Sequence, residues 1–538
     1  MCGISAIRFS STQTQAKPLD NLETLLAESC RTLNHRGPDS HGIFVDREGL
    51  VGLSHARLSI VDIEGGSQPL HDDDDMVHAV VNGELYDYAE IRKDLEAKGY
   101  KIYGQAFVHH LRGEFAFVLY DERLKVLIAA RDRFGIKPLY YTVTNGCLIL
   151  ASEMKAMLPF GVWKPEWDME SIVLLGEMND NRTVFKGVYK LPAGHLLISR
   201  ARTPEPWIRC YWERSFRHPT LVEHRSLDEM IEGVRSRIMD SVRARLRSDV
   251  PLAVYLSGGL DSSAIAGVAR HLLKEMDPSA QLDVFTLAFP DRPEVDEGPI
   301  ARRTAEHIGA RIHFVNPSEA ELSENFERAV YHTEFPSHTF HPAGKLILSQ
   351  YTRHLGFKVV LTGEGSDEVF GGYEFFVKDF LRAIDPAATK LHIPLPTFSE
   401  LQDELQAMEA RPLRQSHFVF FKRPVYDLHA TLGGATVHDG AFHCSAITDA
   451  LSPSAVDPHV LADYPLAVAE GLSPEARGRM ITGRWHPLHS AMYTFSKSVL
   501  QNYILNALGD RVEMAGSIEG RPPFLDHLLV EYVDDLPP

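Results

Sequence analysis

The sequence predicts two architectures in one chain: a strand-rich α+β region, followed by an α/β region built on a doubly wound parallel sheet. Two observations support this division. Short β-type runs broken by Gly, Asn and Asp continue to about residue 200, whereas a pattern of strand, Gly-rich turn and helix begins near residue 250 and then repeats. Strands that alternate with helices are typical of parallel sheets covered on both faces.

The β-type runs of the first region are HAVVNGELY, EFAFVLYDE, KVLIAARD and GCLILAS, and the segment LETLLAESCRTL has the spacing of a helix. From residue 201 to about 217 the sequence is rich in Pro, Arg and Trp, which is typical of a linker. We therefore expect a first domain at residues 2–205, a linker at 206–225 and a second domain at 226–538.

In the second region a helix is predicted after Ser226, where apolar residues follow helical spacing in LDEMIEGVRSRIMDSVRARL. Next come the strand PLAVY with a helix after SGGLDSS, the strand LDVFTLAF with the helix EGPIARRTAEHIG, and the strand FKVVLTGEGSD. Residues 380–538 are predicted to be mainly helical.

Composition excludes several classes of protein. The 538 residues carry a formal charge of −18, which argues against a nucleic-acid partner. No apolar run reaches the roughly 18 residues that crossing a membrane requires, and the first residues do not form a secretory signal. Five scattered cysteines argue against a disulfide framework. We expect a cytoplasmic protein with no membrane partner.

Cys2 is the first candidate catalytic residue. It follows Met1 directly, and removal of the initiator Met would leave Cys2 with a free α-amine. An α-amine has a pKa near 8 and could activate the thiol of its own residue, which is the logic of an N-terminal nucleophile. A cysteine could also stand at this position by accident, so other residues have to support the hypothesis.

Two further motifs supply groups that a cysteine nucleophile would need. Arg57 in HARLSIVD could hold a substrate carboxylate through two hydrogen bonds. Asn82 and Gly83 in VNGELYD offer a side-chain amide and a backbone N–H, which could form an oxyanion hole. Turn chemistry explains each motif taken singly, but it does not explain all of them in this order.

The turn SGGLDSS is the second candidate site, because it ends an apolar strand and begins a helix. Its backbone N–H groups and hydroxyls can bind an anion at the helix N-terminus. It is not a GxxxxGK[ST] loop, since no Lys follows the glycines. Asp261 would repel a bare anion, and it makes sense if Mg²⁺ lies between it and the phosphates. The candidate anion-binding residues are Ser257, Gly258, Gly259, Ser262 and Ser263.

The segment LTGEGSDEVFGGYE follows another strand of the predicted sheet and contributes Glu364, Asp367 and Glu368 among four glycines. Asp367 would be the second Mg²⁺ ligand. A generic acidic turn is the alternative. The 26 histidines form no HExxH motif or paired-ligand spacing, so we expect structural or surface roles for them.

The motifs MCGI, NHRGPD, RLSIVD, VNGELY, LRGEFAFVLYD and RDRFGIKPLYY resemble the glutaminase domain of class II glutamine amidotransferases. This resemblance implies an αββα sandwich of the N-terminal nucleophile (Ntn) type and a thioester formed at Cys2, with ammonia released from glutamine. It also implies that Arg57 holds the glutamine carboxylate, that Asn82 and Gly83 stabilise the oxyanion, and that Glu84 helps to position the substrate.

SGGLDSS, GEGSDEVFGGY and LGDRVEMAGSIEGRPPFLD resemble the ATP-pyrophosphatase synthetases, and the whole chain resembles the glutamine-hydrolysing asparagine synthetase family. The resemblance implies that ATP adenylates the side-chain carboxylate of aspartate or a related acid, and that ammonia from Cys2 attacks the acyl-adenylate. Residues 257–263 would hold the pyrophosphate part, Asp261 and Asp367 would bind Mg²⁺, and Glu364 would be the acid/base candidate. The resemblance leaves open whether the protein forms a homodimer. The implied nucleoside contacts are Leu256, Leu287, Thr362 and Gly363.

The sequence departs from the family pattern in two places. Family members carry an acidic loop before LRGEFAF whose Asp binds the α-ammonium of glutamine, but no acidic residue occurs from Ala97 through Gly113. We predict that glutamine binding is weakened by about 1.5–3 kcal/mol, which calorimetric titration would test. Relatives also continue past PFLD with a Lys thought to steady the adenylation intermediate, whereas this sequence ends at Pro538. A natural-product amide synthetase or cyclase, or an impaired homologue with a binding role, remain alternatives.

Overall fold

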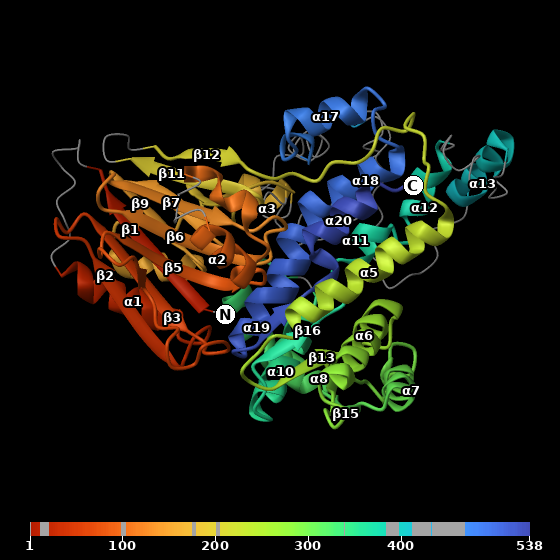
Figure 1. Cartoon of the computed structure of the whole chain (residues 1–538), viewed down its shortest axis with the longest axis horizontal. Helices are drawn as coiled ribbons and strands as arrows, with labels where there is room; N and C mark the ends of the chain where they lie inside the picture. The colour runs from red at the N-terminus through yellow and green to blue at the C-terminus, as the bar shows by residue number, and fades with distance from the viewer. Residues whose placement is uncertain are drawn as a thin grey trace.

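A computed structural model describes residues 2–10, 21–97, 104–174, 179–200, 205–337, 339–383, 397–410, 432 and 468–538. Figure 1 shows a β-sandwich formed by the N-terminal part of the chain lying beside a helix-rich part that contains a separate sheet. The chain begins at the junction of these two parts, close to α19 (Figure 1). Among the described helices, none combines the length and apolarity needed to cross a lipid bilayer.

Two six-stranded antiparallel sheets form the sandwich. The first has the strand order β10, β8, β9, β1, β3, β2, and the second has the order β12, β11, β7, β6, β5, β4. The first comprises β1 (Cys2–Phe9), β2 (Ser40–Val45), β3 (Val51–Arg57), β8 (Tyr140–Thr144), β9 (Cys147–Ala151) and β10 (Val188–Lys190). The second comprises β4 (Leu70–His71), β5 (Val77–Leu85), β6 (Gly113–Asp121), β7 (Val126–Arg131), β11 (His195–Arg200) and β12 (Trp207–Cys210).

The first strand, β1, is buried along its whole length because both of its faces are covered. Successive side chains of a strand point to opposite faces. Ile4 and Ala6 therefore join the core between the two sheets, while Ile7 and Phe9 join the core beneath the helices. This places Cys2, which has the parity of Ile4 and Ala6, on the face that looks toward the second sheet.

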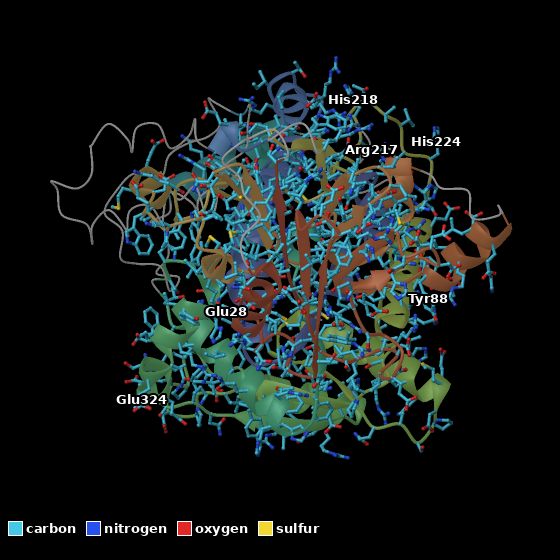
Figure 2. The ribbon with its side chains drawn as sticks, turned by 90° about the vertical axis from the view of Figure 1, so that its left-hand side faces the viewer. Glu28, Tyr88, Arg217, His218, His224 and Glu324 are labelled. Atoms are coloured by element: carbon cyan, nitrogen blue, oxygen red, sulfur yellow. The ribbon has the colours of Figure 1, made fainter. Side chains whose placement is uncertain are left out.

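Helices cover the outer face of each sheet. On the first sheet these are α1 (Leu22–Thr32) and η2 (Met154–Phe160), with Leu26 and Met157 in one core cluster. On the second they are α2 (Tyr88–Ala97) and η1 (Gly104–His110), with Ile91 and Val108 against Phe115. Figure 2 shows Glu28 of α1 and Tyr88 of α2 on opposite sides of the sandwich. The helix–sheet–sheet–helix order confirms the predicted Ntn-type sandwich. The short helix α3 spans Met169–Leu174.

The third sheet is parallel throughout, with the strand order β15, β14, β13, β16, β17. Because β13 is central and has β14 and β16 as neighbours, the turns that follow these three strands meet at one edge of the sheet. This confirms the predicted parallel-sheet region. The strands are β13 (Leu252–Tyr255), β14 (Asp283–Leu287), β15 (Arg311–Val315), β16 (Val359–Leu361) and β17 (Glu519–Arg521).

Helices lie on both faces of this sheet. One core cluster joins α5, α6 and α7 to it, and another joins α10. The helix α5 begins where the sequence predicts, because Ser226 and Glu229 form a reciprocal capping box. The helices are α5 (Leu227–Arg245), α6 (Leu260–Met276), α7 (Gly298–Ile308), α8 (Glu319–Glu324), α9 (Phe326–Thr333), α10 (His341–His354), α11 (Ser366–Phe370), α12 (Phe376–Leu381), α13 (Phe398–Ala410), α17 (Pro474–Ile481), α18 (Pro487–Phe495), η5 (Ser496–Asp510), α19 (Arg511–Ala515), η6 (Pro523–Leu525) and α20 (His527–Asp534).

The edge strand β12 lies within the stretch that the sequence assigned to the linker. Trp207–Cys210 pairs antiparallel with β11, in a register that puts Ile198 opposite Trp207 and His195 opposite Cys210. Backbone pairing along a free sheet edge does not need an alternating apolar pattern, so a segment rich in Arg and Trp can still form a strand.

Buried ion pairs join the sandwich to the second part of the chain. Arg36 donates to Asp510 at 2.6 Å, and both side chains are fully buried. Arg245 of α5 donates to Glu114 of β6 at 2.9 Å. Such pairs hold the two parts in a fixed relation, because separating them would leave uncompensated charges behind.

Candidate active sites

The first candidate site forms where β1 begins and β5 of the facing sheet passes it. The backbone N–H of Cys2 donates to Oδ1 of Asn82 at 2.9 Å. The carbonyl oxygen of Cys2 accepts from Nε of Arg36 at 3.1 Å. These two bonds fix the backbone of the proposed nucleophile from opposite sides.

Arg57 lies directly opposite Cys2 in the pairing of β1 with β3, so both side chains share one face of the sheet. Its guanidinium donates to the carbonyl oxygens of Ile63 at 3.0 Å and Asp62 at 2.6 Å. A third, longer bond of 3.4 Å reaches the carbonyl of Val61. A guanidinium has five N–H donors, so donors remain with which Arg57 could bind a substrate carboxylate.

Asn82 is fully buried, and its Nδ2 has no hydrogen-bond partner. An unpaired buried donor is costly and is usually explained by a group that binds there. The next residue, Gly83, has φ of +144°, and a Cβ at this position would lie 1.9 Å from the carbonyl oxygen of Glu114. Only glycine fits, and its neighbour presents the free amide that an oxyanion hole requires.

Glu84 follows on the same strand and is partly buried. Burial raises its pKa, while Arg521 and Arg247 lower it, and the net shift is upward. The structure therefore brings Cys2, Arg57, Asn82, Gly83 and Glu84 to one end of the sandwich. Their roles toward glutamine remain proposals.

His55 is a residue of this site that the sequence analysis did not single out. It lies two positions before Arg57 on β3, is buried, and its Nε2 lies 3.2 Å from the carbonyl oxygen of Val81 on β5. Burial is the largest influence on the Cys2 thiol and opposes its ionisation, but the adjacent His55, the amino terminus and the backbone of Leu58 together lower the pKa of Cys2 to about 7. The i, i+2 spacing with Arg57 was the signal that could have identified it.

The region of the missing acidic loop lies partly outside the described residues. Residues 104–112 of that region form η1 and the turn into β6 and contain no carboxylate. The nearby Glu114 is occupied, because it accepts from Arg245 and Tyr86 at 2.9 Å each. The prediction of weak glutamine binding therefore stands untested.

The second candidate site begins at the turn between β13 and α6. Gly258 has φ of +93°, a conformation that glycine adopts readily. Oγ of Ser257 accepts from the N–H of Gly259 at 3.2 Å and lies 3.1 Å from Oγ of Ser262. Ser257 and Gly259 are exposed, and Ser263 lies in the first turn of α6. The turn presents polar groups to solvent at the N-terminus of a 17-residue helix.

The turn after β16 touches the turn after β13. A Cβ on Gly363 would lie 2.8 Å from the backbone nitrogen of Ser262 and 3.2 Å from Cβ of Asp261. Glycine is required because the two backbones approach this closely. The segments that the sequence assigned to one nucleotide site are therefore in direct contact.

Three carboxylates gather around this contact. Asp261 stands in the first turn of α6, Glu364 in the turn after β16, and Asp367 in the first turn of α11. Burial, together with repulsion by Asp261 and Glu364, raises the pKa of Asp367 to about 6. Like charges held this close are relieved by a divalent cation, and oxygen ligands are those that Mg²⁺ prefers, so these residues fit the ion.

Lys345 of α10 is a second residue of this site to which the sequence gave no role. Its Nζ lies 3.5 Å from Glu364 and 3.2 Å from the buried Glu513. The ammonium also lies 5.0 Å from the centre of the Tyr255 ring, at the end of β13. The ammonium of Lys345, on the helix α10 that packs against the sheet, thus pairs with Glu364.

The residues expected to contact the nucleoside lie at the same edge. Leu256 directly follows β13 and is buried, and Leu287 ends β14 and is partly buried. Thr362 follows β16, is buried, and its N–H donates to the carbonyl oxygen of Arg521 at 3.1 Å. The edge where three parallel strands end therefore collects all of the predicted nucleotide residues.

Among the described residues, His35, Glu153 and His332 form a cluster with the spacing of metal ligands. The Glu153 carboxylate, however, already accepts from Arg36 at 3.0 Å and pairs with Lys155. A divalent ion would face both of these cations at close range, so electrostatics oppose metal binding here. The cluster is better explained as part of the buried junction.

The comparisons with known proteins agree with this geometry. A family model described as asparagine synthase matches residues 233–538, and one described as glutamine amidotransferase domain matches residues 1–212. Amidase chyE of Penicillium rubens is 38% identical, covering 100% of this chain and 83% of that protein. Amidase chry2 of Gibberella zeae is also 38% identical, with coverage of 100% and 83%. Asparagine synthetase [glutamine-hydrolyzing] 3 of Bacillus subtilis is 28% identical, with coverage of 100% and 81%.

Fold and sites together define an Ntn-type amidotransferase domain joined to a parallel-sheet synthetase domain, which is the organisation of a glutamine-hydrolysing carbon–nitrogen ligase. The chain belongs to the asparagine synthase family, whose members are ATP-dependent amide ligases. The alignment with the Penicillium amidase runs over 573 positions, more than the 538 residues of this chain, so that relative has residues that this chain lacks.

Proposed function

We propose that this protein converts a carboxylic acid to its amide through an acyl-adenylate, using ammonia released from glutamine at Cys2. The observation that carries the proposal is the contact between the turns after β13 and β16, which brings Asp261 near Asp367. A cluster of carboxylates next to an anion-binding helix N-terminus suits a nucleoside triphosphate with Mg²⁺.

When bound, ATP and Mg²⁺ supply the adenylyl group and the charge that offsets its phosphates. The turn at residues 257–263 would bind and orient the pyrophosphate part, and Asp261 and Asp367 would hold the ion. Glu364, held by Lys345, would accept a proton as ammonia attacks the activated carboxyl group. In the sandwich, Asn82 and Gly83 would stabilise the oxyanion of thioester formation at Cys2.

The proposal does not fix which carboxylic acid is converted to its amide. Aspartate is the first acid to test, because the asparagine synthetase of Bacillus subtilis matches the whole chain. The two fungal amidases are more similar, at 38% against 28% identity, and this favours an acid other than aspartate as the second candidate.

The test is a matrix of reactions with ATP and Mg²⁺, each supplied with aspartate or another carboxylic acid, and with ammonium or glutamine. Release of pyrophosphate that depends on one acid, together with its amide, is the expected outcome. We expect ammonium to support the reaction at least as well as glutamine, because the acidic loop is missing. The variant Cys2→Ala should lose only the glutamine-dependent product. A folded protein that releases no pyrophosphate with any acid contradicts the proposal.

A further inference from the structure

Two glutamates share the ammonium of Lys345 at the edge of the parallel sheet where the nucleotide site is proposed. Lys345 lies on α10 and Glu513 lies on α19, and these two helices are neighbours close to β16 (Figure 1). Nζ of Lys345 is 3.2 Å from Oε1 of Glu513 and 3.5 Å from Oε1 of Glu364. The three charges therefore form a chain that ends at Glu364, the proposed proton acceptor for the attacking ammonia.

The buried end of this chain depends on Lys345. The side chain of Glu513 is 4% exposed, and its Oε1 forms no hydrogen bond of good geometry. Burial raises the pKa of Glu513, and the nearby ammonium of Lys345 opposes this shift. If Lys345 turned away to bind another anion, an ionised glutamate would stay buried without its cation, which is strongly unfavourable. Glu513 therefore keeps Lys345 in its place.

The other end of the chain is more open to solvent. The side chain of Glu364 is 35% exposed, whereas that of Lys345 is 16% exposed and its ammonium lies 5.0 Å from the centre of the Tyr255 ring. An acid that enters this edge therefore meets the carboxylate of Glu364 more readily than the ammonium, and the ammonium is already shared by two carboxylates.

Other charged groups around this edge are acidic or already paired. Asp261 and Asp367 add negative charge, which the proposed Mg²⁺ would offset. A second cation, Lys137, acts on Glu513, but it pairs with the buried Glu114 of the sandwich at 3.4 Å. Within the described part of the chain, these two lysines are thus engaged by glutamates, and neither is left to bind a further carboxylate.

We propose that the acceptor of this ligase is an acid with a single carboxylate, and that the cluster of Lys345, Glu364 and Glu513 excludes dicarboxylic acids such as aspartate. This inference rests on the proposed function, because it takes the acceptor to be activated beside Glu364. A second carboxylate would lose water next to Glu364 without gaining a cation. The reacting carboxylate escapes this cost, because its oxygen bonds to the α-phosphorus of ATP and loses its charge as pyrophosphate leaves.

The test compares two pairs of acids that differ by one carboxylate, in assays of pyrophosphate release with ATP, Mg²⁺ and ammonium. β-Alanine is aspartate without its α-carboxylate, and propionate is succinate without one of its carboxylates. We expect kcat/KM to be roughly tenfold or more higher for the monocarboxylic acid of each pair. Equal values within the pairs, or a preference for aspartate or succinate, overturn the proposal.

The variant Glu513→Gln tests the cluster itself. It releases Lys345 from one of its two carboxylates, so the preference for β-alanine over aspartate should shrink by about threefold or more. Glu223→Gln is the matched control, because Glu223 is also buried and pairs with Arg217 and Arg225 ahead of α5. An unchanged preference in Glu513→Gln, or an equal change in both variants, overturns the role of the cluster. If Glu513→Gln does not fold, the wild-type comparison of the acid pairs decides alone.

Failure of this inference can be told apart from failure of the proposed function. If neither pair of acids supports pyrophosphate release, the acid of the broader matrix that does so decides by its number of carboxylates. One carboxylate supports the inference, and two overturn it while leaving the amide ligase intact. A folded protein that releases no pyrophosphate with any acid contradicts the proposed function, and the inference falls with it.

Discussion

The two candidate sites of this chain differ in what fixes their polar groups, which is strand pairing and hydrogen bonds in the sandwich but turns that gather like charges in the parallel-sheet domain. In the sandwich, Cys2 is held by Asn82 and Arg36, and the guanidinium of Arg57 is anchored on backbone carbonyls. In the parallel-sheet domain, burial and repulsion by Asp261 and Glu364 raise the pKa of Asp367 to about 6.

This difference shows which structural elements fix the geometry of each site. The nucleophile site is built on strands whose backbone pairing fixes it before any substrate arrives, which is the arrangement that makes an oxyanion hole effective. The proposed nucleotide site is built on turns, and repulsion between its carboxylates helps to raise the pKa of Asp367. We therefore expect the first to be insensitive to Mg²⁺ and ATP, and the second to depend on both.

The largest expected effect is the loss of one site's activity while the other site is unchanged. Asp261→Asn removes a ligand of the proposed Mg²⁺, so ATP-dependent pyrophosphate release should fall by on the order of 10³-fold. Alkylation of Cys2 should be unchanged, because the sandwich does not use the ion. Asp277→Asn, at the other end of α6, is the control and should retain full activity. Equal loss in both variants would mean that the helix as a whole was perturbed.

Asn82→Ala perturbs the other site, because it removes the unpaired amide of the proposed oxyanion hole. Loss of one such donor costs about 10²–10³-fold in turnover, and we expect glutaminase kcat to fall by this amount. Ammonium-dependent amide formation should persist, since it bypasses the sandwich. Steady-state assays with each nitrogen donor make the comparison, and a parallel loss with ammonium would show that the variant had damaged the whole protein.

The smallest effect concerns stability. The folded protein holds a proton on Asp367 up to about pH 6, whereas an unfolded Asp releases it near pH 3.8, so ion-free stability falls as pH rises through this window. Asp367→Asn should therefore stabilise the ion-free protein by about 1–2 kcal/mol at pH 8, after allowance for its partial exposure, and by little below pH 4. Thermal unfolding with and without Mg²⁺ measures this. Added Mg²⁺ should stabilise the wild type more than the variant.

Much of the fold could be predicted because its signals are local. The Gly-rich turn of β13 and the capping box at Ser226 are each written within a few residues of sequence. The edge strand β12 could not be predicted, because its pairing with β11 is a tertiary contact that the composition of the segment does not encode.

The candidate sites divide in the same way. Asp261 and Asp367 lie in recognisable motifs, and topology brings those motifs together. His55 was expected to have a structural or surface role like the other histidines, and no sequence pattern gave Lys345 a role. The link between Arg36 and Asp510 joins residues 474 positions apart, which no local pattern reports. Long-range charge pairs of this kind become visible only in the folded chain.

Arg36 contacts the backbone of the nucleophile, Glu153 within the sandwich and Asp510 at the end of η5. One side chain is therefore shared by both halves of the protein. If the halves were expressed as separate polypeptides, the guanidinium of Arg36 and the carboxylate of Asp510 would each be exposed to solvent without the other. Modular engineering of the chain, such as fusing its sandwich to another synthetase, would have to transplant both residues as a unit.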